Sequence, residues 1–217
     1  MEIMSTKATH RCLIILLLAT VAAGIAAYPH LPNEIASHWN VAGEADNYMG
    51  KFWGVFLFPA LLAGFYLLYA IIPRIDPLKD NIRSFRSAYN LFFIGLAGFF
   101  TYLFALSLWW NLGRRFDFGA AMMPALAALL WMMGMLLQHA KRNWFVGIRT
   151  PWTLSSDRVW KKTHELGSKL FKIAAVIALA GALFGGAAGF LMLMGPLLAA
   201  AVITIVYSYL EYQKEKR

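Results

Sequence analysis

Cysteine and charge are what this sequence has least of. Cys12 is the single cysteine in 217 residues, which excludes an intrachain disulfide and a metal site built from cysteines. Charged residues make up 14% of the chain, whereas a soluble domain carries about 25%. Hydrophobic residues make up 60%, more than a soluble core of this size could bury. The composition therefore indicates an integral membrane protein.

Carboxylates are missing from the middle of the apolar runs. Ion-coupled pumps and transporters usually carry an ionisable group inside the membrane, so this absence argues against that class. The formal net charge is +9, but the basic residues lie between the apolar runs rather than along one helix face. Such a distribution is typical of positive-inside topology, and we expect no direct contact with nucleic acid.

Six apolar runs are each long enough for one membrane helix, with glycine, proline, asparagine or charge between them. They cover residues 12–28, 52–72, 88–112, 119–138, 170–193 and 196–210. The first run also resembles a signal peptide, but an even number of helices favours its retention. Pro196 suits the first turn of the last helix, where its missing N–H is not needed.

Lysine and arginine are concentrated in alternate loops. With the N-terminus in the cytoplasm, 17 of the 20 lie on the cytoplasmic side, and the exceptions are Lys51, Arg114 and Arg115. This bias sets the orientation of a membrane protein. We therefore predict an all-α fold over residues 1–217, a single six-helix transmembrane bundle with both termini in the cytoplasm.

Three glycines in the fifth run, Gly181, Gly185 and Gly189, follow one another at a spacing of four. On one helix they would form a stripe without side chains, which lets another backbone approach closely. We expect this stripe to serve helix packing within the bundle, and a homodimer interface is the alternative.

The loop over residues 29–51 would lie outside the cell and is acidic and polar. Gly43 suits a tight turn, so we expect a folded cap, with a peptide- or ligand-binding surface as the alternative. A metal site would use imidazole and carboxylate ligands, but no established ligand spacing is present, so no metal or cofactor is predicted. The metal candidates are His30, His38, Glu44 and Asp46, and the ligand-binding candidates are His38, Trp39, Asn40, Glu44, Asp46 and Lys51.

The cytoplasmic loop over residues 139–169, here called the signature segment, is the longest polar interruption in the second half of the chain. Pro151 disfavours helix at Thr150, and a serine can then cap an amphipathic helix over residues 157–166 that ends near Gly167. We expect this helix to lie along the membrane surface, with tryptophans anchored at the interface. His164 is expected to be a structural histidine.

The preceding cytoplasmic loop, residues 73–87, carries alternating charges. Asp76, Lys79, Asp80 and Arg83 are interpreted as a solvated face.

Two stretches resemble one known family. Residues 32–59 resemble a small membrane-associated domain of unknown function that commonly forms the N-terminal part of SdpI-type immunity proteins, through Pro32, His38, Trp39, Asn40, Gly43, Glu44, Ala45, Asp46, Lys51 and Pro59. The signature segment is similar to the C-terminal signature of the same family. That similarity rests on Asn143, Trp144, Gly147, Ile148, Arg149, Thr150, Pro151, Trp152, Thr153, Leu154, Trp160, Thr163, His164, Gly167 and Lys169.

The resemblance implies a multi-pass protein of the bacterial plasma membrane that resists a secreted antimicrobial peptide of the sporulation-delaying type. It implies membrane lipids and a peptide toxin as partners, and no catalysis. In the founding member it also implies that the toxin-engaged protein holds a small transcriptional repressor at the membrane, but no repressor-docking site is recognisable in these loops. We expect first contact with the toxin at the outer loop, and a structural or signalling role for the signature segment.

Two other function classes remain as alternatives. A small-molecule or lipid transporter is disfavoured because no inverted repeat is apparent. An intramembrane enzyme could use His38, Glu44 and Asp46, or Arg149, Thr163 and His164, but no serine or cysteine nucleophile motif accompanies them.

Overall fold

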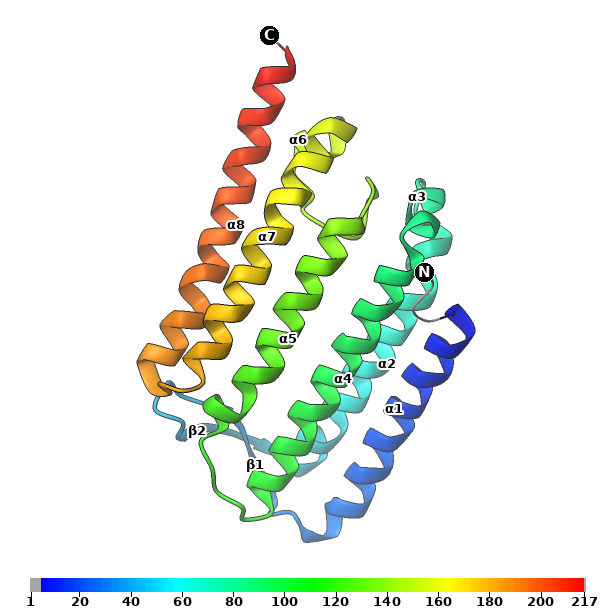
Figure 1. Ribbon diagram of the computed structural model, residues 1–217. Helices are drawn as coiled ribbons and strands as arrows, with labels where there is room; N and C mark the ends of the chain where they lie inside the picture. The colour runs from blue at the N-terminus through cyan, green and yellow to red at the C-terminus, as the bar shows by residue number, and fades with distance from the viewer. Residues whose placement is uncertain (1–4, 217) are drawn as a thin grey trace.

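Six long helices lie side by side in the computed structural model, which describes residues 5–216 (Figure 1). They are α1 (Thr6–Ala27), α2 (Lys51–Ile75), α4 (Arg86–Asn111), α5 (Phe118–His139), α7 (Asp157–Gly181) and α8 (Gly186–Lys216). The shorter elements are the 3-10 helix η1 (Tyr28–His30), strands β1 (Glu34–Trp39) and β2 (Ala45–Gly50), and helices α3 (Lys79–Ser84) and α6 (Pro151–Ser155). The two strands lie at one end of the bundle, the hairpin end. α3, α6 and the far end of α8 lie at the other, the signature end (Figure 1).

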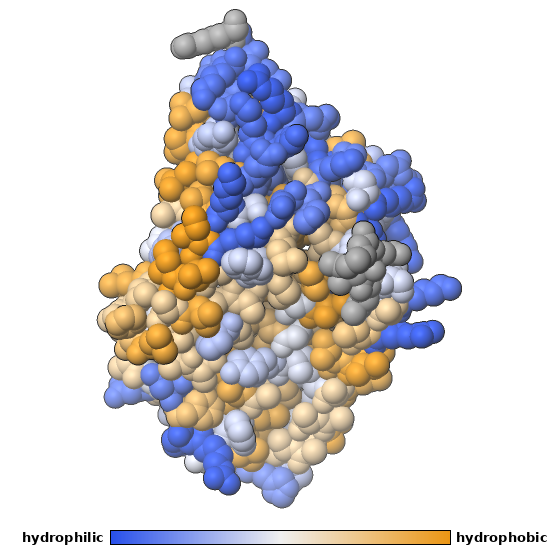
Figure 2. All heavy atoms as spheres, viewed as in Figure 1, coloured by the Kyte–Doolittle hydropathy of each residue, from blue (hydrophilic) through white to orange (hydrophobic). Residues whose placement is uncertain are grey.

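The surface is that of a multi-pass membrane protein. Five of the described helices are long and apolar enough to cross a membrane: α1 with η1, α2, α4, α5 and α8. Large apolar side chains such as Leu18, Leu67 and Leu198 are exposed on them. Figure 2 shows a band of hydrophobic residues between hydrophilic residues at both ends. α7 is less hydrophobic than these five helices because its first half is charged, yet it packs against both α5 and α8.

The bundle consists of two groups of three helices. α1, α2 and α4 pack on one another, α7 packs on α5 and on α8, and the two groups meet mainly along α4 and α5. Buried aromatic residues fill the first group near the signature end, where the hydroxyl of Tyr69 donates to Asn90 Oδ1 at 3.0 Å. Because the two groups meet mainly along α4 and α5, their other helices can surround a cavity at the hairpin end.

The predicted boundary between the last two helices is wrong. α7 ends at Gly181 and α8 begins at Gly186, so Pro196 lies inside α8 and not in its first turn. The chain reverses at Gly185 and Gly186, whose φ values of +61° and +49° suit glycine because it has no Cβ. A proline inside a membrane helix is tolerated where neighbouring groups satisfy the freed backbone.

The three-glycine stripe is consequently divided between two helices. Gly181 lies at the end of α7, Gly185 in the turn and Gly189 in α8. The expected close approach is present nevertheless, because a Cβ added to Gly189 would lie 2.7 Å from the carbonyl oxygen of Gly181. The glycines pack α7 against α8 across a helical hairpin instead of forming one face of one helix.

The prediction of a separate interfacial helix over residues 157–166 is also wrong. Residues 157–181 form one continuous helix, α7, and Gly167 lies within it. A Cβ at Gly167 would lie 2.6 Å from Ile148 Cδ1 and 3.3 Å from Leu137 Cδ1. The glycine therefore permits close packing of the signature segment and does not end the helix.

The outer loop contains the only described strands, which an all-α prediction missed. β1 and β2 pair antiparallel, with Glu34 opposite Gly50 and Trp39 opposite Ala45. Gly43 has a φ of +79° in the connecting turn, as its position predicted, and its N–H donates to the carbonyl of Asn40 at 2.9 Å. The outer loop therefore forms a folded cap, as expected, and its fold is a β-hairpin.

Candidate functional site

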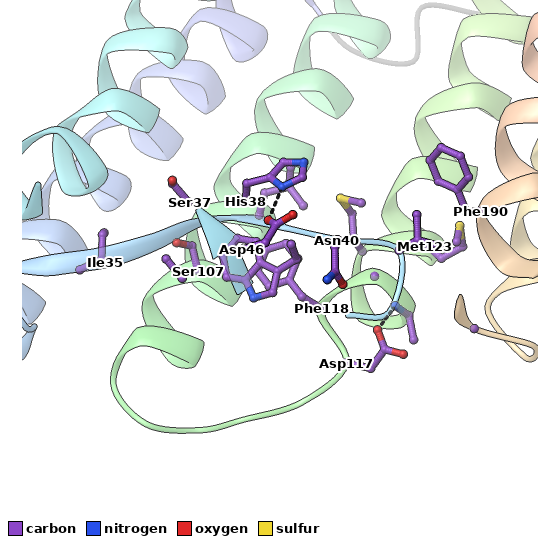
Figure 3. A pocket seen from close by; sticks show the side chains of 18 of the residues that line it. Ile35, Ser37, His38, Asn40, Asp46, Ser107, Asp117, Phe118, Met123 and Phe190 are labelled. Carbon is purple, nitrogen blue, oxygen red and sulfur yellow. Dashed lines mark hydrogen bonds and ion pairs between the residues drawn. The ribbon is translucent and has the colours of Figure 1, made fainter. Parts of the chain in front are cut away.

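A cavity of about 680 Å³ opens at the hairpin end, and we call it the hairpin cavity (Figure 3). The hairpin contributes residues from Ile35 to Val41 with Asp46 and Met49, and the helices contribute from α2, α4, α5 and the start of α8. The cavity thus lies where the two groups of helices and the hairpin meet. Its size is within the range of ligand-binding pockets, about 300–1,000 Å³.

The walls of the hairpin cavity are mostly apolar. Their large apolar side chains include Leu57, Phe58, Leu103, Phe118, Met122, Met123, Phe190 and Leu193. The polar side chains among them are Ser37, His38, Asn40, Asp46, Ser107 and Asp117. None of the described lining residues is lysine or arginine. An apolar pocket with two carboxylates at its mouth, those of Asp46 and Asp117, suits a ligand that carries both apolar groups and a positive charge.

Side chains of α4 and α5 hold the hairpin in place. The side chain of Asn111 accepts from the amide of Ala36 at 2.8 Å and donates to the carbonyl of Ala36 at 3.2 Å. Trp39 stacks on Phe118 with ring centroids 3.7 Å apart and planes 5° apart. The hairpin is therefore a fixed wall of the cavity.

His38 and Asp46 face each other across the two strands. His38 Nδ1 lies 2.5 Å from Asp46 Oδ1, and the side chains are 65% and 43% exposed. Figure 3 shows this contact beside the cavity, with Asn40 further along the hairpin. The pair leaves the carboxylate of Asp46 at the cavity mouth, accessible to a ligand.

Asp117 is a cavity residue that the sequence analysis missed. It caps α5 by accepting the amide of Ala120 at 2.9 Å. A Cβ on Gly43 would lie 3.1 Å from Asp117 Oδ1, and one on Gly185 would lie 3.6 Å from Asp117 Oδ2. Two turns with positive φ thus converge on this carboxylate. An aspartate directly before a helical apolar run is an N-cap signal, which could have identified it.

The remaining candidates of the outer loop are further from the cavity. Glu44 accepts from Asn40 Nδ2 at 3.2 Å in the turn, and Lys51 Nζ lies 4.7 Å from the centre of the Tyr28 ring. Neither lines the cavity. Over residues 5–216 no group of three or more His, Cys, Asp and Glu could hold a metal ion. His38, Trp39, Asn40 and Asp46 are the outer-loop candidates that the structure brings together.

At the signature end, Asn143 organises the loop after α5. It is fully buried, and its Oδ1 accepts the amides of Phe145 and Val146 at 3.0 and 2.6 Å. Its Nδ2 donates to the carbonyls of Lys141 and Val146. An asparagine that binds its own backbone stabilises a turn.

Gly147 and His164 form the next contact of this segment. Gly147 has a φ of +118°, and a Cβ there would lie 2.4 Å from His164 Nε2. Nε2 accepts the amide of Ile148 at 3.0 Å, so the proton must be on Nδ1, 2.8 Å from the carbonyl of Trp160. Burial lowers the pKa of His164 to about 4. The ring is neutral and structural, and neither nitrogen is free to act as a base.

Two threonines start α6 and fasten it to α8. Thr150 and Thr153 form a reciprocal capping box, and Pro151 occupies the first turn. Thr150 Oγ1 lies 3.0 Å from Ser208 Oγ on α8, and Trp152 packs on the ring of Tyr209. The polar groups of this stretch are used within the protein.

The other signature residues also lie in internal contacts. Trp160 is 2% exposed and donates from Nε1 to the carbonyl of Ala140 at 2.8 Å, so it is a core residue and not a membrane anchor. Arg149 donates to the carbonyl of Trp144 at 2.6 Å. Thr163 is fully buried, and its hydroxyl has no hydrogen-bond partner among the described residues. Trp144, by contrast, is half exposed.

Two protein-family models match separate segments of the chain. The model of the SdpI/YfhL protein family matches residues 139–208, and that of a domain of unknown function, DUF1648, matches residues 15–63. Over 202 residues the chain is 26% identical to "Immunity protein SdpI" of Bacillus subtilis (strain 168), covering 93% of this chain and 94% of the relative. The chain is therefore similar to the SdpI family in both segments and along most of its length. No solved structure matches it significantly.

Both family segments, residues 15–63 and 139–208, contribute to the hairpin cavity. The DUF1648 segment supplies the hairpin wall with Leu57 and Phe58 of α2. The SdpI/YfhL segment supplies Phe190 and Leu193 of α8. The segments are far apart in the sequence, and the cavity is a place where they meet.

Proposed function

We propose that this protein gives immunity to a secreted antimicrobial peptide of the sporulation-delaying type by binding the peptide at the hairpin end, without catalysis. The name and similarity of the B. subtilis relative support the immunity role. The observation that carries the mode of action is the hairpin cavity, which is apolar and has acidic residues at its mouth. Such a surface suits an amphipathic peptide arriving from outside.

The proposal places the protein in the bacterial plasma membrane with the hairpin end outside. Lys51, Arg114 and Arg115 are the basic residues of the outer loops, whereas most other lysines and arginines are near the signature end. Positive-inside bias then places the signature end, with both ends of the chain, in the cytoplasm. A secreted peptide would meet the hairpin first.

The alternative of an intramembrane enzyme at the signature segment is disfavoured by His164. Both of its ring nitrogens are engaged with backbone groups, so it lacks a free lone pair for general-base chemistry. We do not extend the proposal to holding a repressor, because the polar groups of Asn143, Thr150 and Thr153 are used to fold the segment itself.

The test is protection in living cells. The chain is expressed in a strain that the peptide kills, with its presence in the membrane confirmed by immunoblot of the membrane fraction. We expect survival to rise with expression, and expect survival to be lost when residues 34–50 are replaced by a Gly-Ser linker of the same length. Unchanged killing of cells that carry the intact protein in their membrane would refute the proposed function.

A further inference from the structure

We propose that the hairpin cavity is the peptide-binding site, and that it takes apolar side chains of the peptide while Asp117 and Asp46 bind an adjacent positive charge. This inference rests on the proposed function and names the part of the protein that performs it. The cavity, at about 680 Å³, holds a few large side chains and not a whole peptide. The rest of the peptide would remain at the membrane surface around the hairpin.

Part of the apolar lining of the cavity is accessible from outside the protein. Leu57 of α2 and Phe190 of α8 line the cavity and are 37% and 44% exposed. They come from the two separate groups of helices, Leu57 from one and Phe190 from the other. Large apolar side chains of a peptide that leave water for this space favour binding through the hydrophobic effect.

The charge of the mouth determines which peptide fits. Asp46 and Asp117 line it, and no described lining residue carries a permanent positive charge. The nearby Arg115 stacks on the Trp110 ring, with its guanidinium carbon 3.4 Å from the ring centre, instead of pairing with Asp117. A lysine or arginine of the ligand would therefore meet carboxylates at the edge of an apolar, low-dielectric space, where a charge pair is stronger than in water.

Binding there would also link the two family segments. Asp117 lies between the turn at Gly43 and the turn at Gly185, one in the hairpin and the other between α7 and α8. A ligand cation at Asp117 would contact both turns. The site is therefore complete only when the hairpin and the α7–α8 turn are both in place.

Two pairs of matched variants test the site. Leu57→Trp fills the cavity, and Leu61→Trp is its control, because Leu61 is one turn further along α2, is equally exposed at 37%, and does not line the cavity. Asp117→Asn removes the negative charge but preserves the helix cap, because asparagine is an equally good N-cap residue. Its control is Asp80→Asn, at an exposed position of α3 at the signature end.

Binding is measured with full-length protein in nanodiscs by fluorescence anisotropy. The probes are a labelled synthetic peptide of leucine, phenylalanine and lysine and its counterpart with glutamate in place of lysine. We expect Leu57→Trp and Asp117→Asn each to weaken binding of the lysine peptide about fivefold or more, a change of about 1 kcal/mol. The two controls should bind as wild type does, and Asp117→Asn should not weaken binding of the glutamate peptide.

The outcomes separate this inference from the proposed function. If Leu57→Trp and Asp117→Asn bind the lysine peptide and protect cells as wild type does, the cavity is not the site, although the immunity role stands. If native mass spectrometry finds a phospholipid that Leu57→Trp displaces and the peptide does not, the cavity is a lipid site and the inference is wrong. If the intact protein does not protect cells at all, the proposed function fails first.

Discussion

Asp76 Oδ2 accepts a hydrogen bond from the backbone amide of Trp144 at 2.9 Å. Asp76 follows the end of α2, and its other carboxylate oxygen accepts the amide of Leu78 at 2.6 Å. The residue is 2% exposed, so its interpretation as part of a solvated face is wrong. Asn81 adds a second link by donating from Nδ2 to the carbonyl of Arg142 at 2.7 Å. The signature segment is thus fastened to the other group of helices.

Asp76→Ala should therefore destabilise the whole protein. It removes two hydrogen bonds to a buried carboxylate and leaves two backbone amides without these partners. Hydrogen bonds to charged groups contribute about 1.5–3 kcal/mol each, so we expect the loss of two to lower the free energy of unfolding by about 3–6 kcal/mol. The measurement is thermal unfolding in detergent, followed by intrinsic fluorescence.

Asp80→Ala is the control for that loss. Asp80 is 80% exposed and pairs with Arg83 on the surface of α3, a kind of pair that contributes about 0–1 kcal/mol. Equal unfolding temperatures for the two variants would contradict the role assigned to Asp76.

His164 should make the stability depend on pH in one direction. Burial holds its pKa at about 4, below the ordinary value of 6.5, so the folded protein resists protonation while the unfolded chain accepts a proton. The stabilisation is complete above pH 6.5 and is lost as the pH falls from 6.5 to 4, by up to about 3 kcal/mol. We expect the unfolding temperature of the wild type to fall over this interval.

His164→Gln tests whether this residue is the cause. Glutamine does not titrate, so the variant should lose most of the pH dependence between 6.5 and 4 even if it is less stable at every pH. His139→Gln, at an exposed position near the end of α5, should keep the wild-type slope. Identical slopes for His164→Gln and wild type would assign the effect to other groups.

Gly189 should be the glycine of α8 that tolerates an added methyl group least. A Cβ added to Gly189 would lie 2.7 Å from the backbone oxygen of Gly181. This clash can be relieved only if α7 and α8 move apart. Gly195 is also in α8 but has no atom within 4 Å of its added Cβ among the described residues. We expect Gly189→Ala to destabilise by about 1–3 kcal/mol, and Gly195→Ala to be neutral or to stabilise by up to about 1 kcal/mol. Thermal unfolding of both variants would show this, and a harmless Gly189→Ala would refute the close packing of α7 on α8.

The apolar runs predicted most of the membrane helices, because a run of about 20 apolar residues leaves few other structures available. They did not predict where α7 ends. The apolar stretch after Lys172 contains Gly185–Gly186 and Gly195–Pro196, and either pair can end a helix. The positive φ values at the first pair, and the packing of Gly181 on Gly189, are tertiary facts that local signals do not contain.

Long-range polar contacts were beyond sequence reasoning for a similar reason. Lys162 donates to Glu211 at 2.6 Å across 49 residues, and Glu211 is 3% exposed although it lies among the charges near the end of α8. Spacing along one helix shows neighbours of that helix only. For the candidate site, the outer-loop residues His38 and Asp46 were found from composition. The sequence could have identified Asp117 as a helix cap, but its position between the hairpin and the α7–α8 turn is a tertiary contact that local signals do not contain.

The orientation of the bundle is testable with single cysteines in a Cys12→Ser background. Glu44→Cys places a thiol in the turn of the hairpin, and Glu215→Cys places one near the end of α8, at an exposed position of the signature end. Because positive-inside bias puts the hairpin outside, a membrane-impermeant maleimide added to intact cells should label the first variant and leave the second unlabelled until the cells are opened. Labelling of Glu215→Cys alone in intact cells would reverse the topology, and a secreted peptide would then meet the signature end and not the hairpin cavity.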